Sequence, residues 1–259
     1  MAEIPELEAL ARHLETHFKD KILHRLELTY TKKLNSYKQD FQQYVEGQRL
    51  HHVTRDGKTL LMKFRRGRVL GLNLMFSGLV KVVEQDEKTE FPIASFYFKE
   101  GGGFILFDQQ KQASVSLDPI PSAIPDVLSK KFNSEYLENH LKNEISEIKK
   151  VLTNQLIVRG VGNSYADEIL WQARISPFSV AKAIPKQKVQ MLYQSMQEIF
   201  NLDITSFAEL VKSGSTANIL DFHKIHNPEK IFSPSGAKIM INESGPRKTY
   251  FTEEQELFK

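Results

Sequence analysis

The 259-residue sequence contains no cysteine, and its charges are nearly balanced. Without cysteine the chain forms neither disulfides nor metal sites with thiolate ligands. The 35 Lys and Arg residues against 32 Asp and Glu give a net charge of +3, so binding to a polyanion depends on where the basic residues lie. No stretch reaches the roughly 18 apolar residues that cross a bilayer, and the first residues lack the apolar core of a secretory signal. We therefore expect a cytoplasmic protein without a membrane segment.

The first half of the sequence has the pattern of one helix followed by short strands. Residues 4–18 predict a helix because Leu7, Leu10 and Leu14 recur at spacings of three and four. Short apolar stretches separated by turn residues follow, and Asp56-Gly57 between two of them is a strong hairpin signal. This pattern predicts an antiparallel sandwich or barrel. The expected strands are 21–30, 50–55, 59–64, 68–76, 79–84, 93–98 and 103–108.

The pattern changes after Asp118-Pro119-Ile120-Pro121, which we interpret as a linker. Three helices are expected beyond it: the first has Ser134 as its N-cap, the second covers 163–173, and the third follows Pro185. The tail predicts a β-hairpin with strands at 238–242 and 247–252. The fold class is therefore α+β, with an antiparallel β-sandwich, a helical region and a C-terminal hairpin. The apolar face of the first helix consists of Leu137, Leu141, Ile145, Ile148 and Leu152.

The stretch Arg159-Gly160-Val161-Gly162-Asn163 joins two of these helices. Two glycines one residue apart let the backbone turn with positive φ. Amides exposed by such a turn face the N-terminus of the next helix, where a phosphate binds favourably. Asn163 adds a side-chain donor, and Lys149 one helix earlier adds a charge. The glycines alone are also compatible with a plain helix–helix turn closed by a glycine C-cap.

A longer string around this turn is more specific. Lys149, Gln155, the stretch 160–170 (GVGNSYADEIL) and the stretch 173–177 (ARISP) closely resemble the helix–two-turn–helix of the formamidopyrimidine-DNA glycosylase / endonuclease VIII (Fpg/Nei) family. The resemblance implies a β-sandwich catalytic domain at 1–120, a helix–two-turn–helix DNA-binding domain at 121–222 and a finger hairpin at 223–259. It also implies that Lys149 and Asn163 hold the phosphate beside a DNA lesion.

The N-terminus, MAEIPELE, resembles the opening of this family, in which a proline after the initiator methionine attacks the sugar and the next glutamate moves protons. Glu3, Pro5 and Glu6 match that pattern, but Ala2 replaces the proline. Roughly a third of a free α-amine is neutral at about pH 7.5, so the Ala2 amine remains a competent Schiff-base nucleophile. Because alanine is small, we expect removal of Met1; with Met1 retained, Ala2 has only an amide nitrogen. The alternative for both glutamates is a helix N-terminal role favoured by the dipole.

Two basic residues outside the helical region also match family positions. Lys58, just past the hairpin turn, matches a lysine that contacts phosphate and assists elimination, although alone it is compatible with a solvated hairpin lysine. Arg247 in GPRKTYF matches the arginine of the family's zinc-finger hairpin, although alone it is compatible with a basic turn. The zinc-binding cysteines of that hairpin correspond to Phe232, Ser235, Thr252 and Gln255, so we expect no metal and a zinc-less finger. The residues expected to pack it are Phe232, Ile239, Ile241, Tyr250 and Phe251.

Side chains are expected to fill the gap that a flipped base leaves in DNA. Phe76 falls at the family's wedge position, although it is also compatible with an ordinary core aromatic of a strand. The other fillers of the family, an arginine and a phenylalanine, correspond to the stretch 108–113 (DQQKQA), where Lys111 stands in for the arginine and no aromatic is present. The loop that covers an oxidised purine is short here, around 213–223. Both departures argue against the usual oxidised-guanine substrate.

The sequence thus predicts a monomeric, cofactor-free DNA glycosylase of base excision repair. Its expected partner is double-stranded DNA with a damaged base or an abasic site, and its expected location is at the nucleoid if the source is bacterial. Ala2 and Glu3 carry the chemistry, and abasic-site lyase activity is weakened because an alanine imine is neutral until protonated. One competing hypothesis is a DNA-binding protein of the same fold that has lost catalysis. A further alternative is a helical-domain protein with a structural or partner-binding role.

Overall fold

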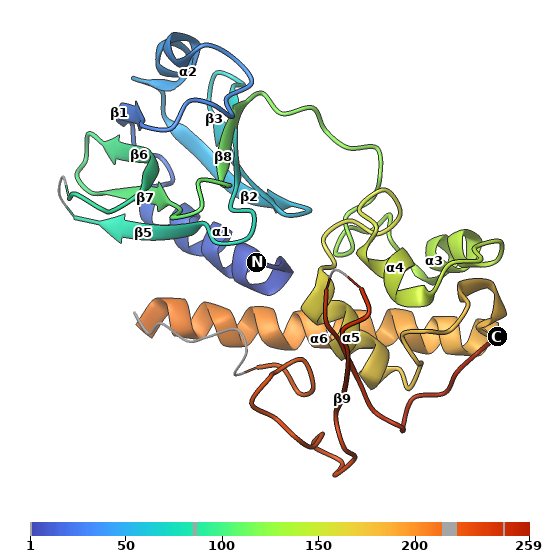
Figure 1. The fold of residues 1–259 in the computed structure, drawn as a ribbon. Helices are drawn as coiled ribbons and strands as arrows, with labels where there is room; N and C mark the ends of the chain where they lie inside the picture. The colour runs from blue at the N-terminus through green and yellow to red at the C-terminus, as the bar shows by residue number, and fades with distance from the viewer. Residues whose placement is uncertain (1, 85–86, 214–221, 246) are drawn as a thin grey trace. The chain divides into compact units, whose positions relative to one another are not determined.

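A computed structural model of the chain describes residues 2–84, 87–213, 222–245 and 247–259 (Figure 1). Its contacts divide the chain into two compact units, Met1–Pro121 and Ser122–Lys259, and the boundary falls at the end of the expected linker. The helical region and the C-terminal hairpin belong to the same unit, and their division into two domains at residue 222 stays a prediction. In the described ranges, no helix combines the length and apolar character needed to cross a membrane.

The first unit begins with helix α1 (Ile4–Phe18), as the leucine spacing predicts, and continues into two four-stranded antiparallel sheets. The strand orders are β1-β6-β7-β5 and β2-β3-β4-β8. A hairpin joins β2 to β3 at Asp56-Gly57, as expected, and Asp56 pairs with Thr59. Helix α2 (Lys38–Val45) and strand β8 were not predicted. The strands are β1 (Leu23–Leu28), β2 (Leu50–Asp56), β3 (Thr59–Phe64), β4 (Val69–Asn73), β5 (Leu79–Val83), β6 (Pro92–Phe98), β7 (Gly103–Phe107) and β8 (Ser114–Leu117).

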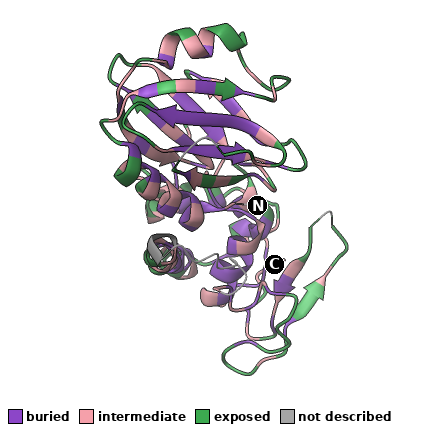
Figure 2. Cartoon of the chain, turned by 90° about the vertical axis from the view of Figure 1, so that its left-hand side faces the viewer, coloured by how far each residue is buried: buried purple, intermediate pink, exposed green. Residues whose placement is uncertain are grey.

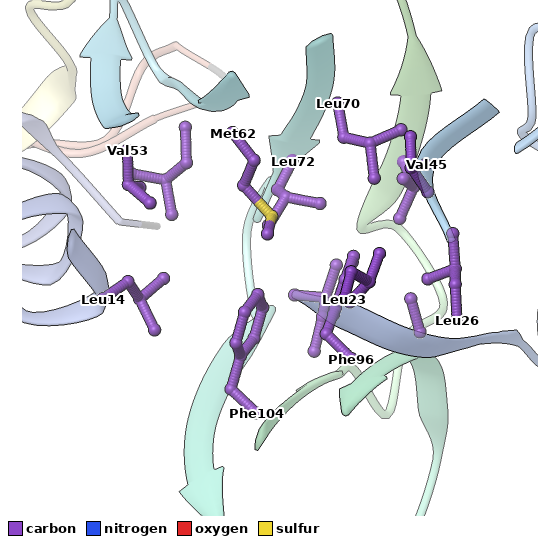
Figure 3. Close-up of a cluster of buried hydrophobic side chains, with 14 of the residues drawn as sticks. Leu14, Leu23, Leu26, Val45, Val53, Met62, Leu70, Leu72, Phe96 and Phe104 are labelled. Carbon is purple, nitrogen blue, oxygen red and sulfur yellow. The ribbon is translucent and has the colours of Figure 1, made fainter. Parts of the chain in front are cut away.

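Side chains from both sheets and from α1 form the core of the first unit (Figure 3). Alternation along β3 places Leu60, Met62 and Phe64 in this core. Each large apolar side chain buried in it stabilises the fold by about 1.5–3 kcal/mol. Figure 2 shows that buried residues are concentrated on the strands, whereas the connecting loops are exposed. Figure 3 labels ten core residues that are each at most 2% exposed: Leu14, Leu23, Leu26, Val45, Val53, Met62, Leu70, Leu72, Phe96 and Phe104.

Strand β4 ends at Asn73, three residues before the end that the sequence pattern predicts. Met75 has a φ of +52°, a left-handed conformation that interrupts the extended backbone. The Met75 amide donates a hydrogen bond to the Asn73 side chain at 2.9 Å. A Cβ at Gly78 would lie 2.4 Å from the Leu74 carbonyl oxygen, so the turn requires glycine there. Phe76 therefore lies in a tight turn and not in a strand.

The second unit contains the remaining helices, and the first of them differs from the prediction. The single amphipathic helix expected from 134 to 152 is two helices, α3 (Ser134–Leu141) and α4 (Ile148–Thr153). Between them the backbone leaves the helical path, because Glu147 forms an isolated bridge with Val180. Ile145 lies in this break and is 73% exposed, so its placement on the apolar face was wrong.

The N-cap of α3 is Asn133 and not Ser134 as predicted. The Asn133 side chain accepts a hydrogen bond from the Tyr136 amide at 2.8 Å, which satisfies one of the free donors at the helix start. Helix α5 (Asn163–Gln172) matches its prediction closely. The helix expected after Pro185 is α6 (Lys186–Ser213), preceded by the short 3-10 helix η1 (Ala181–Ala183).

The C-terminal hairpin consists of β9 (Met240–Asn242) and β10 (Thr249–Phe251), which pair antiparallel over fewer residues than predicted. Phe251 contacts Phe178 edge to face, with 5.0 Å between ring centroids. Phe232 and Ile241 are 60% and 46% exposed, so their expected packing role was wrong. Only part of the predicted apolar set therefore holds the hairpin. The buried cluster beneath it consists of Trp171, Ile225, Ile239 and Tyr250.

Candidate functional site

The turn before α5 is braced by a glutamine. Gly160 has a φ of +106°, whereas Gly162 is extended, so the expected positive φ occurs at only one of the two glycines. The Gln155 Oε1 accepts from the Gly160 amide at 2.9 Å, and its Nε2 donates to the Val161 carbonyl at 2.8 Å. These bonds fix the turn that sets Asn163 at the first position of α5.

One pocket of the second unit brings together the three residues expected to hold phosphate. Lys149 of α4, Asn163 of α5 and Arg247 of the hairpin loop all line it, and its volume is about 640 Å³. Arg247 is exposed and Asn163 half-buried, while Lys149 is only 8% exposed. Basic side chains beside a helix N-terminus favour an anion. The pocket therefore has the charge and the donors that a phosphate requires.

Lys149 and Asn163 also hold the hairpin. The Lys149 Nζ lies 2.7 Å from the Asp167 Oδ1 and donates to the Lys248 carbonyl at 3.2 Å. The Asn163 Nδ2 donates to the same carbonyl at 3.0 Å. Because Asp167 is fully buried, its carboxylate depends on such a cation. Much of the Lys149 charge is thus balanced inside the protein, and Arg247 supplies an exposed positive charge to the pocket.

Two neighbouring acids of α5 anchor the segment that leads to the hairpin, and sequence reasoning assigned them no role. Asp167 Oδ2 accepts from the Tyr250 amide at 2.9 Å and lies 2.7 Å from the His226 Nδ1. Glu168, which is 3% exposed, accepts from the Lys224, Ile225 and His226 amides at 2.7–2.9 Å. The available signal was two adjacent acids flanked by the apolar residues Ala166, Ile169 and Leu170.

The amino end of the first unit forms a capping box. The Glu3 carboxylate accepts from the Glu6 amide, and the Glu6 Oε2 accepts from the Glu3 amide at 2.8 Å. Glu3 is 2% exposed, and the half-exposed Ala2 precedes it. Burial raises the pKa of Glu6 to about 7, so this carboxyl changes protonation near neutral pH. The capping box shows that both glutamates have the helix N-terminal role considered as the alternative. Both lie within four residues of Ala2 in the sequence.

A buried arginine links α1 to the turn that carries Lys58. Lys58 is half-buried and follows Gly57, whose φ is +59°. The Arg55 side chain is 3% exposed, and its Nε donates to the Glu8 Oε2 at 3.1 Å. A second nitrogen of Arg55 donates to the Gly57 carbonyl at 2.8 Å. Sequence reasoning missed this link, because Arg55 looks like a polar position of a half-exposed strand.

The two expected gap-filling residues lie on neighbouring turns of the first unit. Phe76 is 50% exposed, which contradicts the alternative of a core aromatic. Lys111 is exposed and has a φ of +53°. Its Nζ lies 6.0 Å from the centroid of the Tyr30 ring, at the limit of a cation–π contact.

Asp108 joins these two turns. Its carboxylate is fully buried and accepts from the Ser77 hydroxyl at 2.5 Å, next to Phe76 in the chain. It also accepts three amides on either side of Lys111, those of residues 110, 112 and 113, at 2.6–3.0 Å. Burial alone raises the pKa of Asp108, but these hydrogen bonds outweigh it and hold the pKa below its usual value. Asp108 therefore remains charged and fixes both turns.

The site residues fall into groups within each unit. The first unit contains the amino end with Lys58 and the pair Phe76 and Lys111, and the second contains the pocket with Arg247. Most of the predicted short loop at 213–223 falls on residues 214–221, which lie outside the described ranges, as does Pro246 between the two strands of the tail hairpin. Within those ranges, no group of three or more His, Asp or Glu side chains is arranged to hold a metal ion.

Comparison with known families and relatives gives a consistent result. The family model described as the formamidopyrimidine-DNA glycosylase N-terminal domain matches residues 1–115, and that of the H2TH domain of the same glycosylase matches residues 124–213. The chain is 31% identical to the formamidopyrimidine-DNA glycosylase of Lactobacillus gasseri, over 76% of this chain and 75% of the relative. It is 26% identical to that of Pelotomaculum thermopropionicum, over 97% of each.

Solved structures share the fold. Lactococcus lactis Fpg in a complex with abasic-site DNA superposes with a TM-score of 0.87 at 23% identity, covering 98% of this chain and all of the other. A complex of MutM with DNA containing carbocyclic 8-oxo-G gives a TM-score of 0.87 at 23% identity with the same coverage. At this identity the likeness concerns the fold alone.

Proposed function

The chain belongs to the formamidopyrimidine-DNA glycosylase family, and on this premise we propose that it excises damaged bases from double-stranded DNA through a Schiff base on the Ala2 α-amine. As a family member it is a DNA glycosylase that binds damaged DNA. The observation that carries the proposal is the single pocket lined by Lys149, Asn163 and Arg247, which come from three separate segments of the chain.

In the proposed complex this pocket holds the DNA backbone next to the lesion. The start of α5, the Asn163 amide group and the Arg247 guanidinium offer donors to a phosphate oxygen. Such contacts fix position without selecting sequence. Phe76, exposed on its turn, enters the stack where the damaged nucleotide has left it, and Lys111 lies on the turn that Asp108 ties to it.

The proposed reaction uses groups of the chain alone. The neutral Ala2 nitrogen forms a bond to C1′ of the sugar while the C1′–N bond to the base breaks, and the electron pair leaves with the base, which takes up a proton. The Glu3 carboxylate removes a proton from the attacking nitrogen and then donates it to the ring oxygen as the sugar opens to the protonated imine, while the departed base takes its proton from solvent. Loss of a C2′ proton and departure of the 3′ phosphate cleave the strand, and water releases the amine. Lys58 contacts phosphate and assists this elimination.

Alanine at the nucleophile position weakens the second half of this reaction. A secondary amine such as proline gives an iminium ion that keeps its charge, whereas the imine of a primary amine loses its charge by deprotonation. The electron sink that acidifies the C2′ proton is therefore present for a smaller fraction of the time. We expect base release to exceed strand cleavage.

Borohydride trapping on abasic duplex tests the proposal. Intact-mass measurement first establishes that Met1 has been removed from the protein used. We expect a covalent adduct on the amino-terminal peptide, and Ala2→Pro should increase strand cleavage per base released. Lys58→Ala serves as the comparison because it removes the Lys58 side chain but keeps the Ala2 α-amine.

The alternatives give different results in the same experiment. An adduct on the Lys58 peptide alone would move the nucleophile there. Tight abasic-DNA binding without any adduct or base release, over a panel of lesions, would leave a DNA-binding protein of this fold that has lost catalysis.

A further inference from the structure

The base of the C-terminal hairpin is organised around one carboxylate, that of Glu254. Ser235 corresponds to one of the expected zinc-ligand positions, and its hydroxyl donates to the Glu254 Oε1 at 2.5 Å. Thr252 corresponds to another, and its hydroxyl donates to the Oε2 at 3.1 Å. The Ser233 hydroxyl donates to the same Oε2, also at 3.1 Å. The carboxylate therefore binds both limbs of the hairpin.

The same carboxylate binds helix α5 and its C-terminal end. The Trp171 Nε1 donates to the Glu254 Oε2 at 3.0 Å, and an Arg174 guanidinium nitrogen lies 2.6 Å from the Oε1. A carboxylate offers about four lone-pair directions, so these five partners saturate it. Burial alone raises the pKa of Glu254, but the hydrogen bonds from Ser235, Trp171, Arg174 and Ser233 outweigh burial and lower the pKa to about 2.

These hydrogen bonds join chain segments that a structural metal ion would otherwise hold together. A structural zinc fixes separate chain segments by binding side chains from each of them. Here Glu254 lies between the two hairpin limbs and α5, and Gln255, at a third expected ligand position, adds bonds to the Thr252 amide at 2.8 Å and to the Ile175 carbonyl at 2.9 Å. Arg247 precedes β10 on the limb that Thr252 continues. Movement of that limb would therefore displace the guanidinium from the pocket.

We propose that Glu254 is a positioning residue that takes the place of the zinc ion and, through the hairpin, holds Arg247 at the phosphate pocket. The inference rests on the proposed function for its DNA part. In this proposal the hydrogen bonds and ion pair of the Glu254 carboxylate anchor the hairpin, and the buried apolar cluster around Tyr250 packs against it.

The sequence supplies a spectroscopic reporter and a matched control. Trp171 is the only tryptophan, so the indole N–H gives one resonance that reports directly on its bond to Glu254. Glu253 is the adjacent, exposed carboxylate, and Glu253→Gln makes the same chemical change. We expect Glu254→Gln to shift the indole resonance and Glu253→Gln to leave it unchanged. In wild type the resonance should not titrate between about pH 6 and 4, since the pKa of Glu254 lies near 2. Besides Glu254, the charged groups described next to the Trp171 ring are Arg174 and Lys224.

DNA binding tests the link to Arg247. We expect Glu254→Gln to raise Kd for abasic duplex about tenfold, as for the loss of one charge-assisted contact. The slope of log Kd against log salt should fall by about 0.9, one phosphate contact. The double variant with Arg247→Ala should bind no more weakly than Arg247→Ala alone, because both changes remove the same contact. Ser235→Ala, which keeps the carboxylate, should give a smaller change in the same direction.

The outcomes separate the inference from the proposed function. An indole resonance that ignores Glu254→Gln, or that titrates near pH 4.5 in wild type, overturns the carboxylate centre. A shifted resonance with DNA affinity equal to that of Glu253→Gln, or additive losses with Arg247→Ala, overturns the link to the pocket. Failure of wild type to bind abasic DNA overturns the proposed function and the DNA part together, while the indole measurement still decides the role of Glu254 in the hairpin.

Discussion

Replacement of Asp108 by asparagine should uncouple the two gap-filling turns of the first unit. The new side chain would still accept from the Ser77 hydroxyl and the Gln110 amide through its one oxygen. Its amide nitrogen would face the Gln112 and Ala113 amides, which lie 2.6 and 2.8 Å from the second carboxylate oxygen in wild type. The two backbone amides, which are donors, would then face the donor nitrogen of asparagine. Two charge-assisted hydrogen bonds would therefore be lost.

The structure sets the size of this effect. Hydrogen bonds to a charged group contribute about 1.5–3 kcal/mol each, so the loss of two costs at least about 3 kcal/mol. At 1.4 kcal/mol per factor of ten, the equilibrium constant for the ordered turn falls roughly a hundredfold. Abasic duplex, in which a gap must be filled, should therefore bind many-fold more weakly to Asp108→Asn. Undamaged duplex requires no gap filling and should bind as before.

Fluorescence anisotropy on matched abasic and undamaged duplexes measures the ratio of the two affinities. Glu90→Gln is the control, because it removes one negative charge from an exposed side chain of the same unit. Thermal unfolding of both variants reports the stability cost independently. If Asp108→Asn retained the affinity ratio and the melting temperature of Glu90→Gln, Asp108 would not organise these turns.

Three further changes should have distinct results. Arg55→Lys should reduce strand cleavage and weaken DNA binding, since one ammonium cannot reproduce both contacts that fix the turn before the phosphate-contacting Lys58. Glu6→Gln should remove a pH dependence of urea stability: the raised pKa of about 7 means that the folded chain binds the proton more tightly, so wild-type stability falls as pH rises from about 4.5 to 7. Lys149→Ala should lower DNA affinity for all sequences. It should also lower the melting temperature, because Asp167 loses its buried cation and the free energy of unfolding falls by about 3–5 kcal/mol.

Each of these has a comparison that isolates the cause. Arg247→Ala should lower DNA affinity as Lys149→Ala does but leave the melting temperature unchanged, because Arg247 is exposed. Equal melting temperatures for the two variants would contradict the structural role of Lys149. Glu8→Gln should reproduce Arg55→Lys in strand cleavage if the ion pair is responsible. Stability of Glu6→Gln that still fell across the same pH window would assign the dependence to another group.

Local signals predicted much of the fold. The leucine spacing of α1 and the Asp56-Gly57 turn are properties of short stretches, and both appear in the structure as expected. The apolar spacing from 134 to 152 was misleading, because it continues through a break that a distant backbone segment imposes. The bridge between Glu147 and Val180 has no signature in either stretch alone.

Only part of the candidate site could be predicted from the sequence. Lys149, Asn163 and Arg247 followed from a family pattern and line one pocket. The residues that hold the functional groups in place did not, because Asp108, Arg55 and Glu254 are charged residues in polar stretches, which sequence patterns assign to the surface. Their importance comes from partners far away in the chain, such as Trp171 for Glu254.

An anchoring centre built from a carboxylate, hydroxyls, an indole and a guanidinium has a chemical consequence. Thiolates that bind zinc are oxidised to sulfenic acids and disulfides, and soft metal ions compete for them. The Glu254 centre contains no sulfur and is not subject to either reaction. We therefore expect peroxide to leave the hairpin folded at concentrations that would release zinc from a cysteine-based finger.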